Sequence, residues 1–167
     1  LKLKDLVGAV TSSAITSAVI LFIIATANPF GWIMAIEQIP NALSDLLSNL
    51  TDNHILQLIL ISLMLLIMGT FMETIATIII MTPILVPIAL SIGLNPVHFG
   101  VLMMMNLAIG GVTPPLAVGL FTAAKISAIR IEETFPDVLY VLLVMIAAYA
   151  LVLFIPSIAM FIPEYFS

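Results

Sequence analysis

The sequence predicts an all-α integral membrane protein, and three observations support this class. Of the 167 residues, 63% are hydrophobic and only 8% are charged, which is more apolar surface than the core of one water-soluble domain can hide. Several uncharged runs are about as long as a bilayer is thick. Glycines and prolines interrupt other apolar runs, which predicts a broken helix beside the continuous spans.

Composition also excludes several functions. The chain has no cysteine, so it can form neither a disulfide nor a thiolate metal site. Its net charge of -5 is spread over short connections, which argues against nucleic acid as a partner. The sequence contains no HExxH, no GxSxG, no glycine-rich phosphate loop and no paired acids on one membrane helix, so we expect neither an enzyme nor a catalytic residue. The opening LKLKDL has no signal-peptide pattern and is consistent with a piece of a longer chain.

The first apolar run, residues 7–27, predicts a membrane-spanning helix. It contains no charged residue, and 21 residues at ~1.5 Å each cover the roughly 30 Å of bilayer hydrocarbon. Its small residues recur four apart at Ala9, Ser13 and Ser17, which allows close approach of a second helix.

The connection over residues 28–54 is expected to hold an amphipathic helix in its second part. Four leucines stand at the i, i+3, i+4, i+7 spacing of one helix face: Leu43, Leu46, Leu47 and Leu50. Because the charged residues of this segment are acidic rather than basic, two interpretations stay open. The helix lies at the membrane interface, or it is a partly buried connecting helix.

Residues 55–92 are apolar on both sides of a break, GTFMET at residues 69–74. The two arms form either two full spans or a re-entrant hairpin whose tip lies at membrane depth. An ionised Glu73 is costly against lipid but tolerable at a wet, protein-lined tip. It would be equally harmless in an outer loop between two spans, so the residues alone leave this choice open.

The stretch NLAIGGVTPPLAVGL, residues 106–120, divides the next apolar run into residues 97–109 and 116–127. Pro114 and Pro115 supply no N–H, so carbonyls around residues 108–111 are expected to lose their intrahelical partners, and Gly110 and Gly111 permit unwinding. These carbonyls, the Thr113 hydroxyl and the partially negative end of the first half-helix form a cage of hard oxygen atoms. Such a cage suits Na⁺.

The second half-helix begins at about Leu116, and its partially positive N-terminus faces the same place. The start of the second hairpin arm at Thr74 does the same if the hairpin interpretation holds. The ends of broken helices would then hold a cation and the anionic group of a substrate, as in secondary transporters. A kink satisfied by neighbouring helices and a cation channel subunit remain as alternatives.

The last apolar run, residues 138–160, predicts another span, with Pro136 suited to its first turn and Pro156 to a kink. Basic residues precede the first span and stand between the broken helix and the last span: Lys2, Lys4, Lys125 and Arg130. By the positive-inside rule both groups are cytoplasmic, which places residues 28–54, residues 93–96 and the C-terminus on the outer side.

Residues 69–121 contain TPILVPIA, GLNPVHFGV and GGVTPP in this order and spacing. The stretch resembles the large membrane (M) subunit of tripartite ATP-independent periplasmic (TRAP) transporters. The resemblance runs along the whole chain, is strongest in its central third, and covers the C-terminal part of that subunit.

This resemblance implies one half of an inverted-repeat, elevator-type secondary transporter of the bacterial inner membrane, driven by Na⁺. It implies a small membrane (Q) subunit, a periplasmic binding protein and an organic-acid substrate, such as a C4-dicarboxylate or sialic acid, as partners beside the lipid bilayer. It favours the re-entrant hairpin for residues 55–92. Because the first repeat is missing, a membrane assembly subunit that does not itself transport is a further alternative.

The resemblance also divides the chain and completes the set of candidate site residues. Residues 1–54 would form a scaffold helix and an interfacial connecting helix, 55–92 the hairpin, 93–130 the broken helix, and 131–167 a C-terminal scaffold helix. The candidates for the Na⁺ site are Gly69, Gly110, Gly111, Thr113 and Leu116. The candidates for substrate binding are Thr70, Thr74, Asn106, Pro114 and Pro115.

Overall fold

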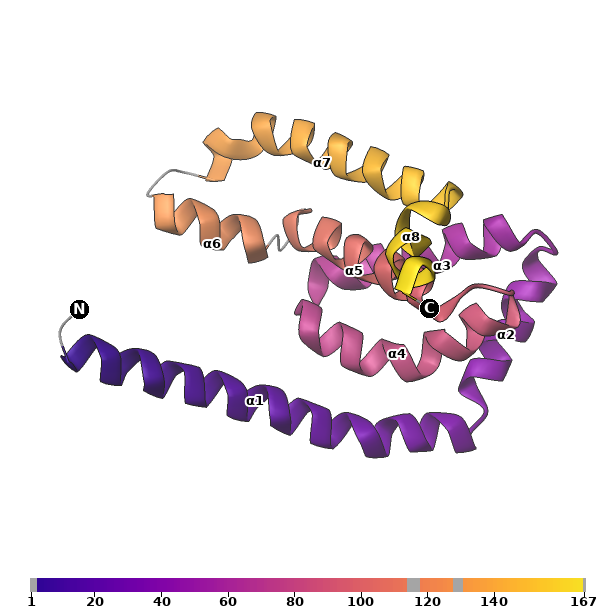
Figure 1. The fold of residues 1–167 in the computed structure, drawn as a ribbon, viewed down its shortest axis with the longest axis horizontal. Coiled ribbons are helices and arrows are strands. Elements are labelled where there is room, and N and C mark those ends of the chain that lie inside the picture. The colour runs from indigo at the N-terminus through magenta and orange to yellow at the C-terminus, as the bar shows by residue number, and fades with distance from the viewer. Residues whose placement is uncertain (1–2, 114–117, 128–130, 167) are drawn as a thin grey trace.

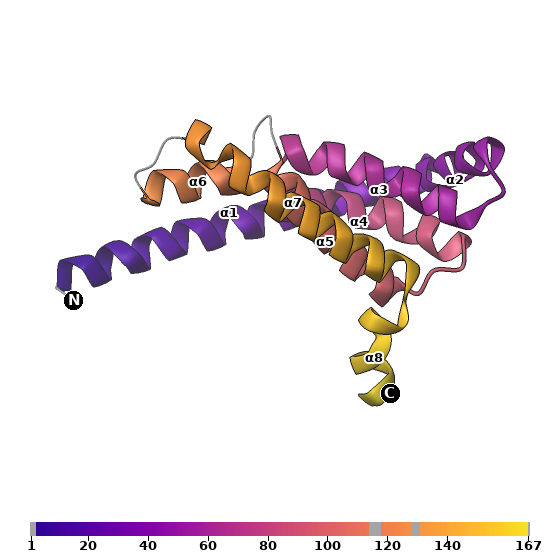
Figure 2. The same ribbon diagram turned by 90° about the horizontal axis from the view of Figure 1, so that it is seen from above.

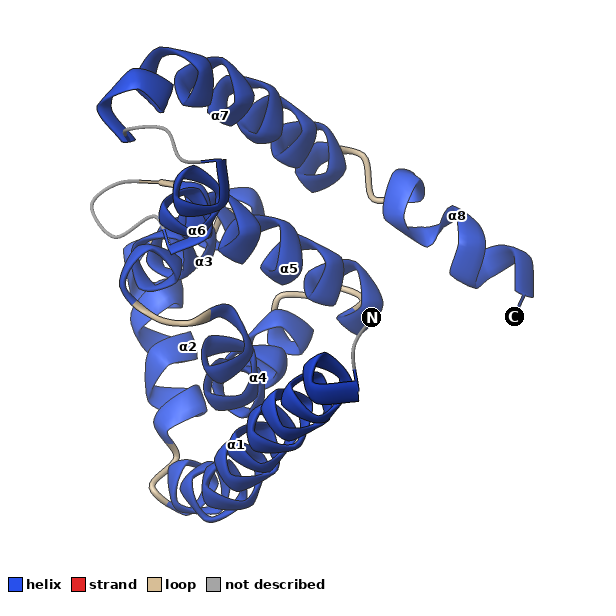
Figure 3. Ribbon diagram, turned by 90° about the vertical axis from the view of Figure 1, so that its left-hand side faces the viewer, coloured by secondary structure: helices blue, strands red, loops and turns tan. Residues whose placement is uncertain are grey.

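A computed structural model describes residues 3–113, 118–127 and 131–166 of the chain. Every regular element in these ranges is an α-helix, as Figure 3 shows. In chain order the helices are α1 (Leu3–Ile36), α2 (Ile39–Leu50), α3 (His54–Phe71), α4 (Thr74–Ser91), α5 (Pro96–Val112), α6 (Val118–Ser127), α7 (Ile131–Phe154) and α8 (Ser157–Phe166). Among the described helices, α1, α3, α4 and α7 are long and apolar enough to cross a membrane. The predicted all-α membrane class is confirmed.

Helix α1 is longer than the sequence predicted. The helix does not end at residue 27 but continues through Pro29 to Ile36. A proline removes one backbone donor and usually bends or ends a helix. Here the continuation packs against α4: Ala27 is buried, and a Cβ added to Gly31 would lie 3.3 Å from Pro83. The N-terminal half of α1 stands apart from the other helices in Figures 1 and 2.

The amphipathic helix expected between the first two spans is present as α2. Leu43 and Leu47 pack against the hydrophobic core, whereas Leu46 and Leu50 are 55% and 65% exposed. These contacts favour the partly buried connecting helix over the interfacial one. The chain turns from α1 into α2 at Gln38, whose φ of 56° lies in the left-handed region.

The core lies between α3, α4 and α5. Its most deeply buried side chains come from all three helices: Leu65, Leu85, Ile88, Phe99, Leu102 and Leu107. Side chains cap the starts of these helices, because Asn53, Glu73 and Asn95 each accept a hydrogen bond from a backbone N–H of the following helix. Two residues, Met72 and Glu73, join α3 to α4, so these two helices form a hairpin.

The hairpin turn lies part-way along the molecule. In Figures 1 and 2 the turn between α3 and α4 is level with the C-terminal end of α5. Helix α6, the first part of α7 and the N-terminal part of α1 extend beyond it on the same side. The opposite side holds α2, the start of α3, the link between α4 and α5, and the end of α7. The start of α1, the end of α6 and the start of α7, which the positive-inside rule assigned to the same side of the membrane, therefore lie on one side of the molecule.

The break predicted within the apolar run of residues 97–127 is confirmed, because α5 and α6 are separate helices. The first half is three residues longer than predicted and ends at Val112, so Gly110 and Gly111 belong to its last helical turn. The expectation that these two glycines unwind the chain is wrong. Thr113, which follows, has an extended backbone with φ -86° and ψ 130° and ends the helix.

The last span also differs from the prediction. Helix α7 runs from Ile131 to Phe154, so Pro136 lies inside it rather than in a first turn beginning near residue 138. Pro156 does more than kink the helix: α7 ends before it and α8 begins at Ser157. Figure 2 shows α8 leaving the direction of α7, so the expected continuous span to residue 160 is wrong.

Candidate functional site

The C-terminal ends of α3 and α5 touch at two glycines. A Cβ added to Gly110 would lie 2.7 Å from the carbonyl carbon of Gly69 and 2.8 Å from its Cα. A Cβ added to Gly69 would lie 3.1 Å from the Leu107 side chain and 3.4 Å from the Cα of Gly110. Only glycine permits such a close approach of two helix backbones. The structure thus brings together the two residues that the resemblance assigned to one ion site.

A cavity of about 260 Å³ opens beside this contact. It is lined by the last turn of α3, the hairpin turn, the last turn of α5 and the first turn of α6: Gly69, Met72, Glu73, Thr74, Ala108, Gly111, Val112 and Gly119. Three predicted site residues, Gly69, Thr74 and Gly111, therefore share one cavity. Two helix C-termini meet there, and the partial negative charges of their terminal carbonyls add together.

Thr113 closes the end of α5. Its N–H donates to the Gly110 carbonyl at 3.0 Å, and its hydroxyl donates to the Ile109 carbonyl at 2.6 Å. These two carbonyls are therefore partnered, which corrects the expectation of bare carbonyls at Ile109 and Gly110. The Thr113 hydroxyl oxygen still has lone pairs with which to meet a cation, because it donates its proton to Ile109.

Helix α6 begins close to the end of α5. A Cβ added to Gly119 would lie 3.3 Å from the Gly111 carbonyl oxygen. Gly119 thus lets the second half-helix approach the terminal carbonyl of the first one. Sequence analysis did not select this residue, and its signal is a glycine in the first turn after a break, where no turn requires one. Pro114, Pro115 and Leu116, three of the predicted site residues, lie outside the described ranges.

The start of α4 is already capped by the protein itself. The Glu73 carboxylate accepts a hydrogen bond of 2.9 Å from the Ala76 N–H. The predicted use of the partially positive end at Thr74 as an anion site therefore faces a competitor within the chain. Glu73 itself is exposed and lines the cavity, so it places a formal negative charge where two partially negative helix ends meet.

Two predicted substrate residues lie away from the cavity lining. The Thr70 hydroxyl is bonded to the Ile67 carbonyl at 2.6 Å within α3. Asn106 is only 2% exposed, and its amide donates to the Ser62 carbonyl at 2.7 Å and to the Tyr149 hydroxyl at 3.3 Å. In this structure the contacts of Asn106 hold helices together, and its role in substrate binding stays a prediction.

Sequence analysis missed this buried network. The Ser62 and Tyr149 hydroxyls are bonded to each other, and Asn106 contacts both residues, so the network joins α3, α5 and α7. A second contact attaches α7 to α5, since the His98 ring lies 3.0 Å from the Val152 carbonyl oxygen. The only signal in the sequence was polar side chains inside apolar helices, which indicates hydrogen bonding between membrane helices without naming the pairs.

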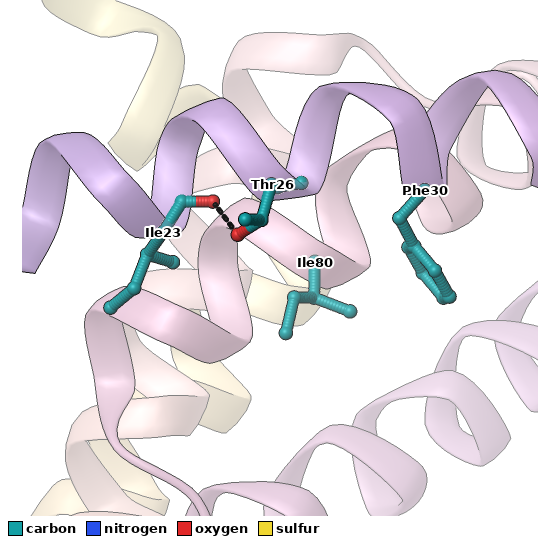
Figure 4. A pocket seen from close by; sticks show the side chains of 5 residues that line it. Ile23, Thr26, Phe30 and Ile80 are labelled. Carbon is teal, nitrogen blue, oxygen red and sulfur yellow. Dashed lines mark hydrogen bonds between the residues drawn. The ribbon is translucent and has the colours of Figure 1, made fainter.

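Another cavity, of about 250 Å³, lies between α1 and α4. Figure 4 shows its lining residues Ile23, Thr26, Phe30 and Ile80, with the Thr26 hydroxyl bonded back to the Ile23 carbonyl at 3.0 Å. Ala27 completes the lining, so the wall is almost entirely apolar. A space of this kind offers nothing to a charged acid, so the hairpin-tip cavity is the better site of these two.

Comparison with known proteins identifies the family of the chain. Residues 1–158 match the family described as tripartite ATP-independent periplasmic transporter, DctM component. The chain belongs to this family. Within the described part of this DctM chain, no group of three or more His, Asp or Glu side chains could hold a metal ion.

Several curated relatives are similar over nearly all of this DctM chain. The isethionate TRAP transporter permease protein of Oleidesulfovibrio alaskensis is 43% identical over 152 residues, covering 91% of the chain and 24% of the relative. The sialic acid TRAP transporter large permease protein of Vibrio cholerae is 36% identical, covering 99% of the chain and 39% of the relative. The C4-dicarboxylate TRAP transporter large permease protein of Rhodobacter capsulatus is 37% identical, covering 98% and 37%. The chain thus spans well under half the length of these relatives.

Proposed function

We propose that this chain is the C-terminal part of the large permease subunit of a Na⁺-driven secondary transporter that imports organic acids. The observation that carries the proposal is the meeting of two helix C-termini at Gly69 and Gly110, beside a cavity that also holds the start of α4. Broken helices whose ends face one cavity are the binding arrangement of secondary transporters. Three similar relatives are named for isethionate, sialic acid and C4-dicarboxylates, which are all organic anions.

Sodium fits the donor atoms that the site offers. The terminal carbonyls of α3 and α5 and the Thr113 hydroxyl are neutral, hard oxygen donors, and Gly111 and Val112 bring the end of α5 to the cavity wall. Zinc, copper and nickel prefer imidazole or thiolate ligands, whereas alkali cations accept carbonyl oxygens. In the proposed mechanism Na⁺ binds at these carbonyl ends, and its charge then helps to hold the carboxylate of the acid.

The hairpin of α3 and α4 is proposed to be re-entrant. Each arm has 18 residues, about 27 Å of helix, against 34 residues or about 51 Å in α1. The hairpin turn is level with the break after α5, while other helices continue beyond both. Its tip would then lie at membrane depth next to the broken helix, where exposed backbone is tolerated because it lines a cavity.

The helices that carry the site are proposed to move together. Helices α3, α4 and α5 share one core, and the network of Ser62, Asn106 and Tyr149 attaches α7 to it. We therefore assign α7 to this body, although the family resemblance implied a scaffold role for residues 131–167. Helix α1, whose N-terminal half stands apart, remains the candidate scaffold helix.

We further propose that the complete transporter contains a small membrane subunit and works with a periplasmic binding protein that delivers the acid. The protein would reside in the bacterial inner membrane with its C-terminus in the periplasm, as the distribution of lysine and arginine indicates. Accessibility of single cysteines tests this orientation. Cysteines at Asn53 and Asn95 should react with an impermeant reagent from the periplasm and one at Ser127 from the cytoplasm, and the reverse pattern would contradict the orientation.

Uptake by the complete transporter in proteoliposomes tests the proposed function. Uptake of the acid should saturate, should require an inward Na⁺ gradient and should depend on the binding protein. Replacing Na⁺ by choline at constant ionic strength should abolish it. Single-channel conductance from the purified protein, or uptake unchanged in choline, would contradict the proposal and favour a channel.

A further inference from the structure

Glu73 is the charged side chain in the lining of the hairpin-tip cavity. The other residues of the lining are glycines, apolar side chains and the neutral Thr74. The carboxylate is exposed and caps α4 by accepting from the Ala76 N–H. Its backbone carbonyl receives hydrogen bonds from the N–H and the hydroxyl of Thr77 at 3.0 and 2.9 Å. The position of the carboxylate beside the cavity is therefore fixed by the first turn of α4.

The cavity as a whole is electronegative. Two helix C-termini contribute partial negative charge from α3 and α5. The helix N-terminus at the start of α4 is neutralised by the Glu73 carboxylate, so that with the first turn of α6 also in the lining the formal negative charge of Glu73 still dominates. A formal negative charge at the edge of a carbonyl cage raises the local concentration of cations and makes the binding free energy of Na⁺ more favourable.

We propose that the Glu73 carboxylate is the charged wall of the Na⁺ site in this cavity, so that its charge, and not only its capping hydrogen bond, sets the affinity for the cation. The inference rests on the proposed function and adds to it a residue that the carbonyl cage lacks. Glu73 attracts Na⁺ across the cavity while it stays bonded to Ala76. A substrate carboxylate meets a repulsive wall until the cation is in place, which makes Na⁺ the first to bind.

Three substitutions separate charge from capping. Glu73→Gln removes the charge but keeps an amide oxygen that can accept from the Ala76 N–H. Glu73→Asp keeps the charge on a side chain one methylene shorter. Asp52→Asn is the matched control, because Asp52 is an exposed acid just before the start of α3, at the end of that helix away from the hairpin turn.

The measurement is equilibrium binding of radioactive sodium to the complete purified transporter without substrate, with choline holding the ionic strength constant. Glu73→Gln should weaken Na⁺ binding about tenfold, because a full charge next to a partly wet cation is lost. Glu73→Asp should stay within about threefold of the wild type, and Asp52→Asn should bind normally. Thermal unfolding in choline should be the same for wild type and Glu73→Gln.

The other outcomes are distinct. If the wild type binds Na⁺ and Glu73→Gln binds it equally well, Glu73 is only a cap and the inference fails, while the proposed function stands. If Glu73→Asp is as weak as Glu73→Gln, shape rather than charge is responsible and the inference again fails. If the wild type binds no Na⁺ and transports in choline, the proposed function fails and takes the inference with it.

Discussion

Replacing Gly110 by alanine tests the contact on which the site depends. The added Cβ would lie 2.7 Å from the carbonyl carbon of Gly69, against the 3.4 Å at which ordinary contact begins, so the two backbones have to separate by about 0.7 Å. The obstacle is backbone on both helices, which cannot turn aside as a flexible side chain can. Overpacking of this kind costs about 1–3 kcal/mol.

Gly100→Ala is the matched control, because Gly100 lies in the same helix with nothing within 4 Å of an added Cβ. Alanine is favoured over glycine in a helix by about 1 kcal/mol, so the control should be neutral or slightly stabilised. Thermal unfolding of the purified transporter should separate the two variants by the overpacking cost, about 1–3 kcal/mol.

Na⁺ binding provides the second readout for Gly110→Ala. Separation of α3 from α5 moves the Gly69 carbonyl away from the end of α5, so the Na⁺ concentration for half-maximal uptake should rise about tenfold or more. Gly100→Ala should leave it unchanged. If Gly110→Ala matches the control in both stability and Na⁺ dependence, the close approach of the two helices is not needed and the site is placed wrongly.

Two further substitutions probe groups around the site. Thr113→Ala removes the hydroxyl that is bonded to the Ile109 carbonyl and is proposed to face Na⁺. The affinity for Na⁺ should fall about tenfold to hundredfold with the fold retained, and raising the Na⁺ concentration should restore uptake. An unchanged Na⁺ dependence of uptake would show that Thr113 only caps α5. Tyr149→Phe removes the hydroxyl shared with Ser62 and Asn106; thermal unfolding should report a loss of about 1–2 kcal/mol, and Tyr140→Phe, at a side chain 71% exposed, should report almost none. Equal stability of the two tyrosine variants would argue against the network.

Two prolines in this chain have different effects on their helices, and the local sequence does not distinguish them. Proline usually bends or ends a helix, yet α1 continues through Pro29 while α7 ends before Pro156. The difference lies in what each segment contacts. The part of α1 beyond Pro29 packs Gly31 against Pro83 of α4, whereas α8 buries no described residue fully.

Tertiary contacts also explain the glycines at the end of α5. Gly110 and Gly111 permit unwinding, and the two prolines that follow suggested it. In the structure both glycines are helical. A glycine is required at position 110 not for unwinding but for the close approach of Gly69, a residue 41 positions earlier in the chain. The resemblance to a family could pair these two positions, whereas local preferences could not.

The sequence alone determined the membrane class, the presence of the apolar helices and the position of the break after α5. These properties depend on composition, on run length and on the conformational limits of proline and glycine, all of which are local. Only the tertiary structure decided that Gly69 meets Gly110, that Asn106 and Tyr149 join three helices, and that Glu73 faces the cavity between two helix ends. Such pairings are set by how whole helices pack, and packing between segments far apart in the chain leaves no periodic pattern in the sequence of either one.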